Sequence, residues 1–410
     1  MNIALVIWEL TIRGGTQRQT IELAHALMRK GHTVDIFCYS YNSKNTFTDL
    51  CNGLTIHAVH TTTGTRRASA NTTPKSYLRV LLYQLKVYAV LLRDLFSVGG
   101  AIQELKALME HAGSLSRFDV INLHDYQVYR LSRIISHPKI VWMMNDIQRA
   151  KSNASPDEYT NPLLALISRA IVRAETNHID TIIVLDERNK QLVKKYYNRE
   201  ARVVRSGVSI DMFGEHEREY RAHDIYSIFA SSIFFPWRRF EDLVDAIGIL
   251  RDRAITSVQL TINGLPDRSP EYYHFICNRI EQLGLESLIT IRTGLSESEL
   301  RDMYTKSDIF IFPNEYQTWG LAVFEAMLAG CACIVSRGAG AHEVLTDTEN
   351  ALLVDPRNPK QIADAIEYLI TDPEQLARIA RAGTAYVRHH RSWDVYAQDM
   401  ITLFAQANHS

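Results

Sequence analysis

Short runs of apolar and β-branched residues alternate with longer amphipathic stretches along the first half of the chain. The runs cover residues 3–8, 33–40, 119–125, 139–146 and 181–187. Between the first two, residues 14–31 carry apolar side chains at helical spacing and end at Gly31. Short apolar strands separated by helices are typical of parallel sheets that are buried on both faces. The pattern predicts a doubly wound α/β domain.

The same pattern restarts near residue 227. Apolar runs follow at residues 227–235, 258–264, 288–294, 308–314, 332–338 and 350–356. Helical stretches separate them, and Ser296 with Glu299 forms a capping-box pattern at the start of one. We therefore expect two Rossmann-like parallel-sheet domains, residues 1–205 and 206–387, that face each other across a cleft. The amphipathic segment at about 388–410 is expected to return and pack on the first domain.

Composition narrows the class of protein. A chain of 410 residues is too long for one ordinary core, and 46% hydrophobic with 22% charged residues describes a globular protein. A formal net charge of −1 gives no field that attracts nucleic acid. The five cysteines form no CxxC pair, and Cys331 and Cys333 alternate along an expected strand as small buried residues. Residues 3–7 are too short an apolar run for a signal peptide or membrane span, so a cytoplasmic protein is expected.

Candidate ligand groups follow several strands, where open α/β sheets bind ligands. Gly14 and Gly15 follow the first strand and allow close approach to an anion, although a plain turn is the alternative. His124 ends another strand and could donate a hydrogen bond to a substrate hydroxyl, while Asp125 beside it fits a capping role. The segment around Gly14 and Gly15 does not have the pattern GxGxxG, which argues against a dinucleotide-binding site there.

Arg238 and Arg239 stand at the start of an expected helix, where positive side chains are disfavoured. An anion between them and the helix would explain the pair, since guanidinium groups bind diphosphate through several N–H donors. A solvated surface pair is the alternative.

Residues 314–331, "NEYQTWGLAVFEAMLAGC", lead from a strand through Gly320 into an apolar helix that begins near Leu321. Glu325 lies about one turn into that helix among apolar neighbours, and a buried carboxylate needs partners. Two ribose hydroxyls would satisfy it. The alternative is a structural Glu that caps a neighbouring loop.

Taken together, these segments resemble the GT-B glycosyltransferases of the large retaining family 4. The resemblance rests on "RGGTQR" (13–18), "RSGVSIDMF" (205–213), "LRDMYTKSDIFIFPNEYQTWGLAVFEAMLAGCACIVS" (300–336) and "GAGAHEVLTDTENALLVDP" (338–356). It covers most of the chain, and the order and spacing of the motifs are specific.

The resemblance implies a nucleotide-sugar donor held mostly by the second domain. Glu325 would bind the ribose, and the backbone amides of Trp319, Gly320 and Leu321 would face the donor sugar and diphosphate. Gln317 stands where the family has a Glu near the donor sugar. Gln is neutral, so it cannot act as nucleophile or carboxylate base, but it can still hydrogen-bond a sugar hydroxyl.

Two further positions concern the phosphates and the reaction centre. Ser232 stands near the position of a family Arg, and Arg238 matches a family Lys in the same loop. Arg238 would keep the diphosphate role, and Arg239 would compensate for the missing Arg. His124 matches a family His that contacts the donor sugar. The resemblance thus gives His124, Arg238 and Gln317 as the expected catalytic residues.

The implied reaction is hexosyl transfer with retention of anomeric configuration, without metal or other cofactor, to a glycan or lipid-linked acceptor in envelope polysaccharide or glycoconjugate synthesis. A nucleotide-sugar 2-epimerase and a non-catalytic nucleotide-sugar-binding protein are the alternatives.

Residues 61–95 carry six basic residues and one acidic residue, and three of the basic ones recur every seven positions, at Arg79, Lys86 and Arg93. Two interpretations stay open: a buried helix with one wet edge, or a helix that lies on an anionic membrane near a lipid-linked acceptor.

Overall fold

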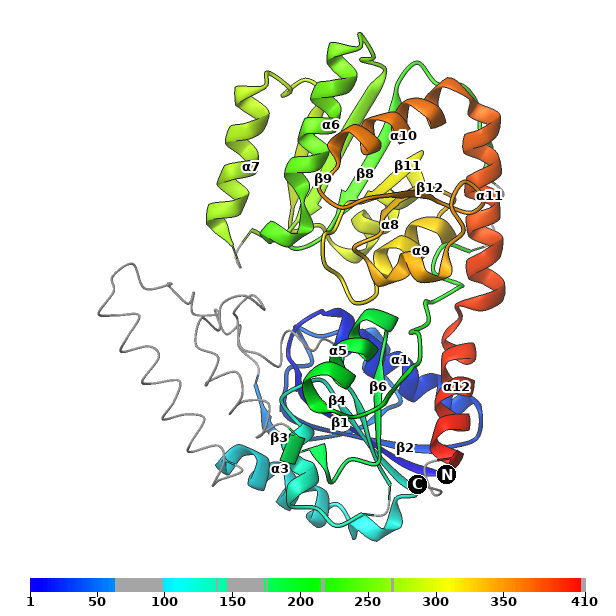
Figure 1. Ribbon diagram of the computed structural model, residues 1–410. Helices are drawn as coiled ribbons and strands as arrows, with labels where there is room; N and C mark the ends of the chain where they lie inside the picture. Colours follow the sequence, from blue (N-terminus) through cyan, green and yellow to red (C-terminus); the bar gives the residue numbers. More distant parts are fainter. Residues whose placement is uncertain are drawn as a thin grey trace, which may run out of the picture. The chain divides into compact units, whose positions relative to one another are not determined.

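The computed structural model describes residues 1–62, 99–137, 139–145, 173–174, 176–214, 218–266 and 269–406. The chain divides into two compact units, one of Met1–Arg205 with Tyr396–Ser410, the other of Ser206–Val395 (Figure 1). The expected boundary after residue 205 coincides with this division. The return to the first unit begins at Tyr396, later than the expected position near residue 388.

The first unit contains a seven-stranded sheet in which every neighbouring pair is parallel, in the order β3-β2-β1-β4-β5-β6-β7. Its strands are β1 (Asn2–Leu10), β2 (Thr33–Tyr41), β3 (Thr55–Thr61), β4 (Val120–His124), β5 (Ile140–Met143), β6 (Thr181–Val184) and β7 (Ala201–Val203). Its helices are α1 (Gly15–Arg29), α3 (Gly100–His111), α5 (Glu187–Tyr197) and most of α12 (Trp393–Gln406), with 3-10 turns η1 (Asp49–Cys51), η2 (Leu115–Arg117) and η3 (Tyr129–Arg133). The five expected strands are confirmed, and β3 and β7 were missed.

Strand β1 shows why the apolar runs are continuous. Ala4 and Val6 join a core cluster with Leu105 and Met109 of α3 on one face of the sheet. Leu5, which points to the opposite face because side chains alternate along a strand, is equally buried. A strand covered on both faces needs apolar residues at every position, as the sequence shows.

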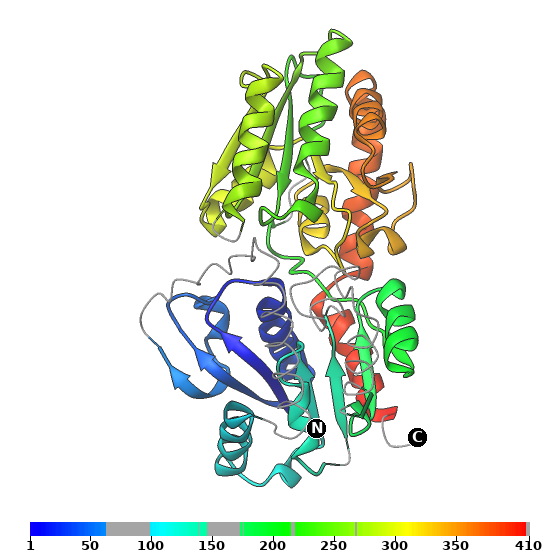
Figure 2. The same ribbon diagram turned by 60° about the vertical axis from the view of Figure 1, so that its left-hand side comes forward.

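The C-terminal helix α12 packs beside α1 within the first unit (Figures 1 and 2). Gln19 of α1 donates from Nε2 to the hydroxyl of Tyr396 (3.2 Å), and Lys139 Nζ lies 3.4 Å from the carbonyl oxygen of Phe404. Met400 and Phe404 are fully buried. The apolar stripe of this helix therefore completes the core of the first unit.

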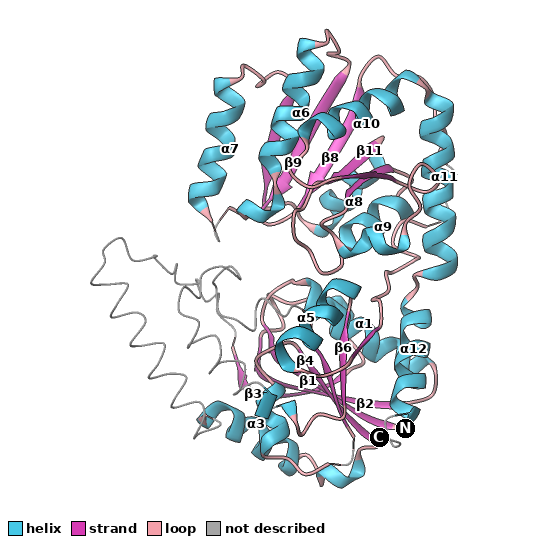
Figure 3. Ribbon diagram, in the orientation of Figure 1, coloured by secondary structure: helices cyan, strands magenta, loops and turns pink. Residues whose placement is uncertain are grey.

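The second unit contains a six-stranded parallel sheet in the order β10-β9-β8-β11-β12-β13, with helices on both sides (Figure 3). Its strands are β8 (Tyr226–Ser231), β9 (Val258–Gly264), β10 (Ile289–Thr293), β11 (Ile309–Phe312), β12 (Ala332–Ser336) and β13 (Leu352–Val354). Its helices are α6 (Phe240–Asp252), α7 (Pro270–Gln282), α8 (Glu297–Lys306), α9 (Leu321–Leu328), α10 (Pro359–Thr371) and α11 (Pro373–His390), with 3-10 turns η5 (Pro236–Arg238) and η6 (Gly340–Val344). All six expected strands and the capping box at Ser296 are confirmed.

The two faces of β8 have different partners. Ile228 packs in a core cluster with Leu243 of α6 and Ile366 of α10. Phe229, one position along, packs edge-on against Tyr304 of α8 with ring centroids 5.3 Å apart. Helices therefore cover both faces of this sheet, as the sequence pattern predicts.

Residues 205–213, one of the family-like motifs, are bonded to residues 392–393, so the segments that begin and end the second unit are joined. Val208 forms a parallel bridge with Ser392, and Trp393 Nε1 donates to Ser209 Oγ (3.0 Å). A Cβ at Gly207 would lie 2.6 Å from the carbonyl oxygen of Ser392, too close for any side chain. Glycine is therefore required at position 207, where the backbone passes close to that of Ser392.

The order of strands reverses at one point in each sheet. In the first unit β1 lies between β2 and β4, and in the second β8 lies between β9 and β11. Open α/β sheets bind ligands beyond the carboxyl ends of the strands at such points. The loops that follow β1, β4, β8 and β11 are therefore the places to look for chemistry.

The basic segment at residues 61–95 lies almost entirely outside the described residues, so neither interpretation of its stripe is tested. Within the described ranges, no helix is both long and apolar enough to cross a bilayer.

Candidate active site

The loops after β8 and β11 bring Arg238, Asn314 and Gln317 into contact. Arg238 ends the η5 turn, and its Nη1 donates to the side-chain oxygen of Gln317, 79 residues away in the chain. Asn314, fully buried after β11, satisfies both its polar atoms when Nδ2 donates to the carbonyl oxygen of Arg238 (3.2 Å) and Oδ1 accepts from Nη1 (2.9 Å). The structure thus joins two of the predicted catalytic residues and adds Asn314, which the sequence analysis did not select.

The backbone of Gln317 is fixed by the loop that follows β12. Its N–H donates to the carbonyl oxygen of Gly338 (3.3 Å), and its own carbonyl oxygen accepts from the N–H of Gly340 (2.8 Å). A Cβ at Gly338 would lie 2.3 Å from the carbonyl oxygen of Glu315, so a glycine is needed for this approach. The side chain of Gln317 therefore starts from a rigid position.

Helix α9 begins at Leu321, as predicted, directly after a strained glycine. Gly320 has φ 116° and ψ 63°, a region that side chains avoid, and a Cβ there would lie 2.9 Å from the ring of Phe312. The first N–H groups of a helix lack partners within the helix and carry its positive dipole. No acidic side chain occupies the first turn of α9, so none of its own carboxylates offsets the positive end of the dipole.

Trp319 supports that helix start from inside. Its ring is buried, stacks on Phe324 with centroids 4.8 Å apart, and lies under the guanidinium of Arg391 at 5.8 Å. Its carbonyl oxygen accepts from the N–H of Ala341 (3.0 Å). These contacts fix the backbone that leads into α9. The sequence analysis predicted a donor contact for the backbone amide of Trp319, and that contact stays a prediction.

Glu325 lies in the second turn of α9 and is 7% exposed. Tyr304 of α8, itself buried, donates its hydroxyl to Glu325 Oε2 at 3.4 Å. Tyr304 is thus a partner of Glu325 within the protein, and the sequence analysis did not predict this contact. The predicted ribose contact stays a prediction.

Arg239 has carboxylate partners on its own helix. It takes a left-handed backbone (φ 56°) as the residue that caps α6, and its guanidinium binds Asp242 through Nε (3.0 Å) and Nη2 (2.7 Å). Nη1 lies 2.6 Å from Glu241 Oε1. Hydrogen bonding and charge from these carboxylates raise the pKa of Arg239 against the opposing effect of burial. These contacts give Arg239 a structural role at the start of α6, and nothing in them supports its predicted contact with diphosphate.

In the first unit, His124 ends β4 and is fully buried. Its Nε2 lies 2.8 Å from Asn122 Oδ1, whose amide is oriented by a bond from Nδ2 to the carbonyl oxygen of Val141 (3.1 Å). Its Nδ1 lies 3.1 Å from Thr20 Oγ1 on α1. Because an amide oxygen only accepts, Nε2 carries the proton and Nδ1 is the unprotonated nitrogen that faces Thr20 Oγ1, whose hydroxyl donates to the carbonyl oxygen of Thr16 (3.0 Å).

Burial lowers the pKa of His124 to about 3, so the ring is neutral near pH 7. Both nitrogens face side chains of the first unit, which ties β4 to α1. The predicted hydrogen bond from His124 to a sugar hydroxyl stays a prediction, and in this arrangement the Nε2 proton is donated to Asn122.

Gly14 and Gly15 lie where β1 leads into α1. Gly14 has an extended backbone and caps the helix, and Gly15 is its first residue. A Cβ at Gly15 would meet no atom within 4 Å, so this position leaves room at the helix start. Thr16 beside it accepts a bond from Asn145 Nδ2 (3.2 Å), which brings the loop after β5 to the same place.

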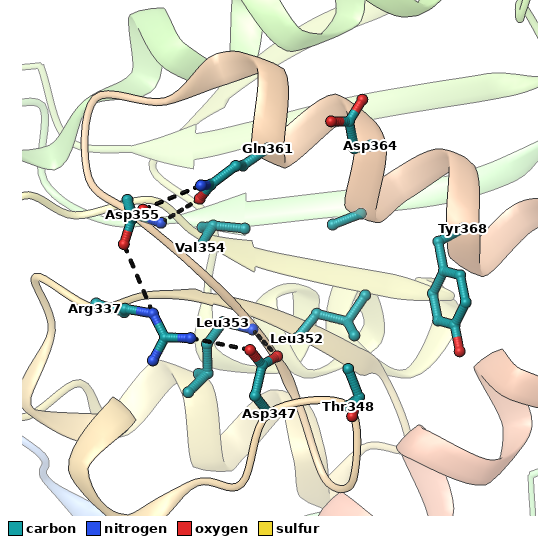
Figure 4. Close-up of a pocket in the computed structure, with 11 residues that line it drawn as sticks. Arg337, Asp347, Thr348, Leu352, Leu353, Val354, Asp355, Gln361, Asp364 and Tyr368 are labelled. Carbon is teal, nitrogen blue, oxygen red and sulfur yellow. Dashed lines mark hydrogen bonds and ion pairs between the residues drawn. The ribbon is translucent and has the colours of Figure 1, made fainter.

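A separate hollow of about 480 Å³ lies between β13 and α10 (Figure 4). Arg337 projects into it between Asp347 (2.9 Å) and Asp355 (3.7 Å), and Gln361 Nε2 donates to Asp355 Oδ2 (3.1 Å). Asp364, which also lines this hollow, pairs with Arg253 (2.7 Å) and Lys360 (2.8 Å). The hollow lies on the opposite side of β12 from β11, away from the Arg238 loop.

Comparison with known proteins identifies the family. The sequence model of Glycosyltransferase Family 4 matches residues 13–212, and that of Glycosyl transferases group 1 matches residues 215–386. The chain is 22% identical to an uncharacterized glycosyltransferase of Methanocaldococcus jannaschii over 98% of both chains. It is 28% identical to D-inositol 3-phosphate glycosyltransferase of Corynebacterium glutamicum over 42% of this chain and 41% of that relative.

Among solved structures, Anabaena HepE in complex with UDP has the same fold, with a TM-score of 0.70 and 16% identity over 99% of this chain and 100% of that one. The two sheets are those of a GT-B fold. The chain belongs to the family 4 glycosyltransferases, and the resemblance drawn from its motifs is confirmed.

Proposed function

We propose that the protein transfers a hexosyl group from a nucleotide-sugar donor to a hydroxyl acceptor with retention at the anomeric carbon and without a metal ion. The observation that carries this proposal is the pairing of Arg238 with Gln317 in two loops at the switch point of the second sheet. Helix α9 begins directly after one of those same loops, with no acidic residue in its first turn. A guanidinium and a helix N-terminus are groups that bind a diphosphate.

The proposed step is a front-side displacement. The bond between C1 of the sugar and the diphosphate oxygen breaks, and its electron pair stays on the diphosphate. The acceptor oxygen bonds to C1 from the same face, and its proton passes to the departing diphosphate oxygen. Gln317 is neutral and cannot form a glycosyl ester, so no covalent intermediate is assigned to that position.

The protein then contributes position and charge. Arg238 and the first N–H groups of α9 stabilise the charge that grows on the diphosphate, and preorganised donors of this kind are the largest single term in many enzymes. Glu325, a buried carboxylate in the second turn of α9, accepts hydrogen bonds from the ribose hydroxyls.

The donor base stays open between uridine and guanosine. UDP is the nucleotide bound in the solved structure of HepE, and mannosyltransferases of Mycobacterium tuberculosis that depend on GDP-mannose match part of this chain. For the acceptor we propose a glycan or lipid-linked glycan. Contact of residues 61–95 with the inner face of an anionic membrane is part of the same proposal, and co-sedimentation with anionic vesicles at low salt tests it.

The direct test incubates the protein with a panel of UDP- and GDP-sugars and glycan acceptors and follows the anomeric proton by NMR. We expect one donor to be consumed, with a product of the same anomeric configuration. Inversion would refute the displacement described here. Epimerised donor without transfer would favour a 2-epimerase, and binding without turnover would favour a non-catalytic protein.

A further inference from the structure

We propose that Arg391 is a positioning residue for donor binding: its guanidinium holds the ring of Trp319 and thereby fixes the backbone that leads into α9. This inference rests on the proposed function, because it takes the start of α9 as a place where the diphosphate binds. It deepens that function by adding a residue that acts on the donor through Trp319.

Arg391 caps the C-terminal end of α11 and is held by both its backbone and its side chain. Its N–H donates to the carbonyl oxygen of Val387 (2.9 Å), and its own carbonyl oxygen accepts from the N–H of Val208 (2.7 Å). In the side chain, Nε and Nη2 both donate to the hydroxyl of Tyr386, at 3.0 and 2.7 Å. These bonds give the guanidinium a defined direction.

The ring of Trp319 is the group that this guanidinium meets. Cζ of Arg391 lies 5.8 Å from the ring centroid, a distance at which a cation is attracted to the face of an indole. Phe324 stacks on the same ring at 4.8 Å. The indole Nε1 has no hydrogen-bond partner in the part of the chain that the structure describes. Ring contacts, and not a hydrogen bond, therefore hold this side chain in place.

The position of that ring matters because the next residue has no side chain. Gly320 caps α9 with φ 116° and cannot supply a cap hydrogen bond of its own. Glycine also permits many backbone conformations, so its neighbours decide which one it adopts. On the side that precedes the helix, that neighbour is Trp319, whose carbonyl oxygen accepts from Ala341 (3.0 Å) and whose ring meets Arg391. The guanidinium thus helps to set the direction of the first N–H groups of α9.

Helix α11 runs beside α9 and carries a second arginine that makes the same kind of contact elsewhere (Figure 1). The guanidinium of Arg381 lies over the ring of Tyr220, 5.2 Å from its centroid. Tyr220 donates its hydroxyl to the carbonyl oxygen of Gly330 (3.0 Å), which follows the C-terminal end of α9. Arg381 is therefore a matched control, because its ring contact lies at the other end of the same helix.

The test measures binding of UDP, GDP and ADP to the full chain and its variants by calorimetry. Arg391→Met removes the cation and keeps an unbranched side chain, and Arg381→Met makes the same change over Tyr220. Tyr386→Phe is a milder change that removes the hydroxyl orienting the guanidinium, and it carries the test if Arg391→Met does not fold. Thermal melting shows which variants are folded and how much stability each has lost.

We expect Arg391→Met to weaken the nucleotide that wild type binds by about tenfold, because a site that is competent for about a tenth of the time binds that much more weakly. Tyr386→Phe should weaken it by about threefold, the effect of one hydrogen bond that orients a group. Arg381→Met should lower the melting temperature by a similar amount to Arg391→Met but leave the affinity within about twofold of wild type.

A double-mutant cycle shows whether Arg391 acts through Trp319. Trp319→Phe keeps a ring but offers a weaker face to a cation. If the two residues act as a pair, Arg391→Met should weaken binding by less than about threefold in the Trp319→Phe background.

Three results would overturn the inference: unchanged affinity in the folded Arg391→Met or Tyr386→Phe variant, equal losses in Arg391→Met and Arg381→Met, or the full loss from Arg391→Met in the Trp319→Phe background. Failure of wild type to bind any of the three nucleotides is a different result, which would overturn the proposed function and this inference with it.

Discussion

Arg238→Ala tests whether this guanidinium contributes to donor binding and turnover rather than to folding. It removes the guanidinium that meets Gln317 and Asn314 at the switch point of the second sheet. Arg239→Ala is a matched control one residue along, since it removes the same side chain from a site that is filled by Asp242 and Glu241.

The size of the effect follows from charge. A guanidinium about 4 Å from a phosphate oxygen contributes roughly 4 kcal/mol at an effective dielectric constant near 20. Loss of one preorganised donor to a developing oxyanion lowers kcat by about 10²–10³-fold. We therefore expect Arg238→Ala to lose on the order of 10²–10³-fold in kcat/KM. Asn314, which is fully buried, loses one partner, so unfolding becomes easier by about 1–3 kcal/mol.

The assay follows transfer from the donor that the panel selects, well below the melting temperature of every variant. Arg239→Ala should lose stability, because two carboxylates at the start of α6 lose their partner, while transfer stays within about threefold of wild type. Far-ultraviolet circular dichroism shows whether each variant keeps its helices.

Two results would refute the reasoning. Wild-type turnover in Arg238→Ala would remove that residue from the reaction. Equal losses of turnover in Arg238→Ala and Arg239→Ala would mean that the loop as a whole matters, and not the guanidinium of Arg238.

Three further predictions concern the glycine before α9, the buried histidine and the metal. Gly320→Ala forces a side chain into φ 116° and against Phe312, so the free energy of unfolding should fall by about 1–3 kcal/mol in urea titrations; an unchanged midpoint would contradict this. His124 has a pKa near 3 when folded and near 6.5 when unfolded, so stability should be unaffected above pH 6.5 and fall by up to about 1.4 kcal/mol per pH unit between 6.5 and 3. His124→Gln, measured by urea titration at each pH, should reduce that slope, and an equal slope would be evidence against the assignment. Transfer should persist in EDTA, and a strict requirement for Mg²⁺ would contradict the proposed use of Arg238.

The fold was predictable because both sheets are buried on two faces, which forces apolar residues into every position of the central strands. The strands that were missed lack this signal. β3 (Thr55–Thr61) is an edge strand whose residues are half-buried or exposed and include His57 and His60, and β7 (Ala201–Val203) has three residues.

The helix start at Gly320 and Leu321 was also predictable, since a glycine before an apolar helix is a local signal. The partners of each side chain were not, because they depend on how distant loops meet. Gln317 and Arg238 are 79 residues apart, and His124 meets Thr20 across 104 residues. The left-handed backbone of Arg239, which points its guanidinium at Asp242, has no signature that the residue type alone could give.

The most direct test of the central claim is a thermal shift of the full chain against UDP, GDP, ADP and NAD, with UDP- and GDP-sugars, in wild type and Arg238→Ala. A ligand at about 100 times its dissociation constant should stabilise the protein by roughly 2.7 kcal/mol. We expect one nucleoside diphosphate and its sugars to raise the melting temperature of wild type, and the shift to be lost in Arg238→Ala. No shift with any nucleotide sugar, or the same shift in both proteins, would contradict a donor site built on Arg238.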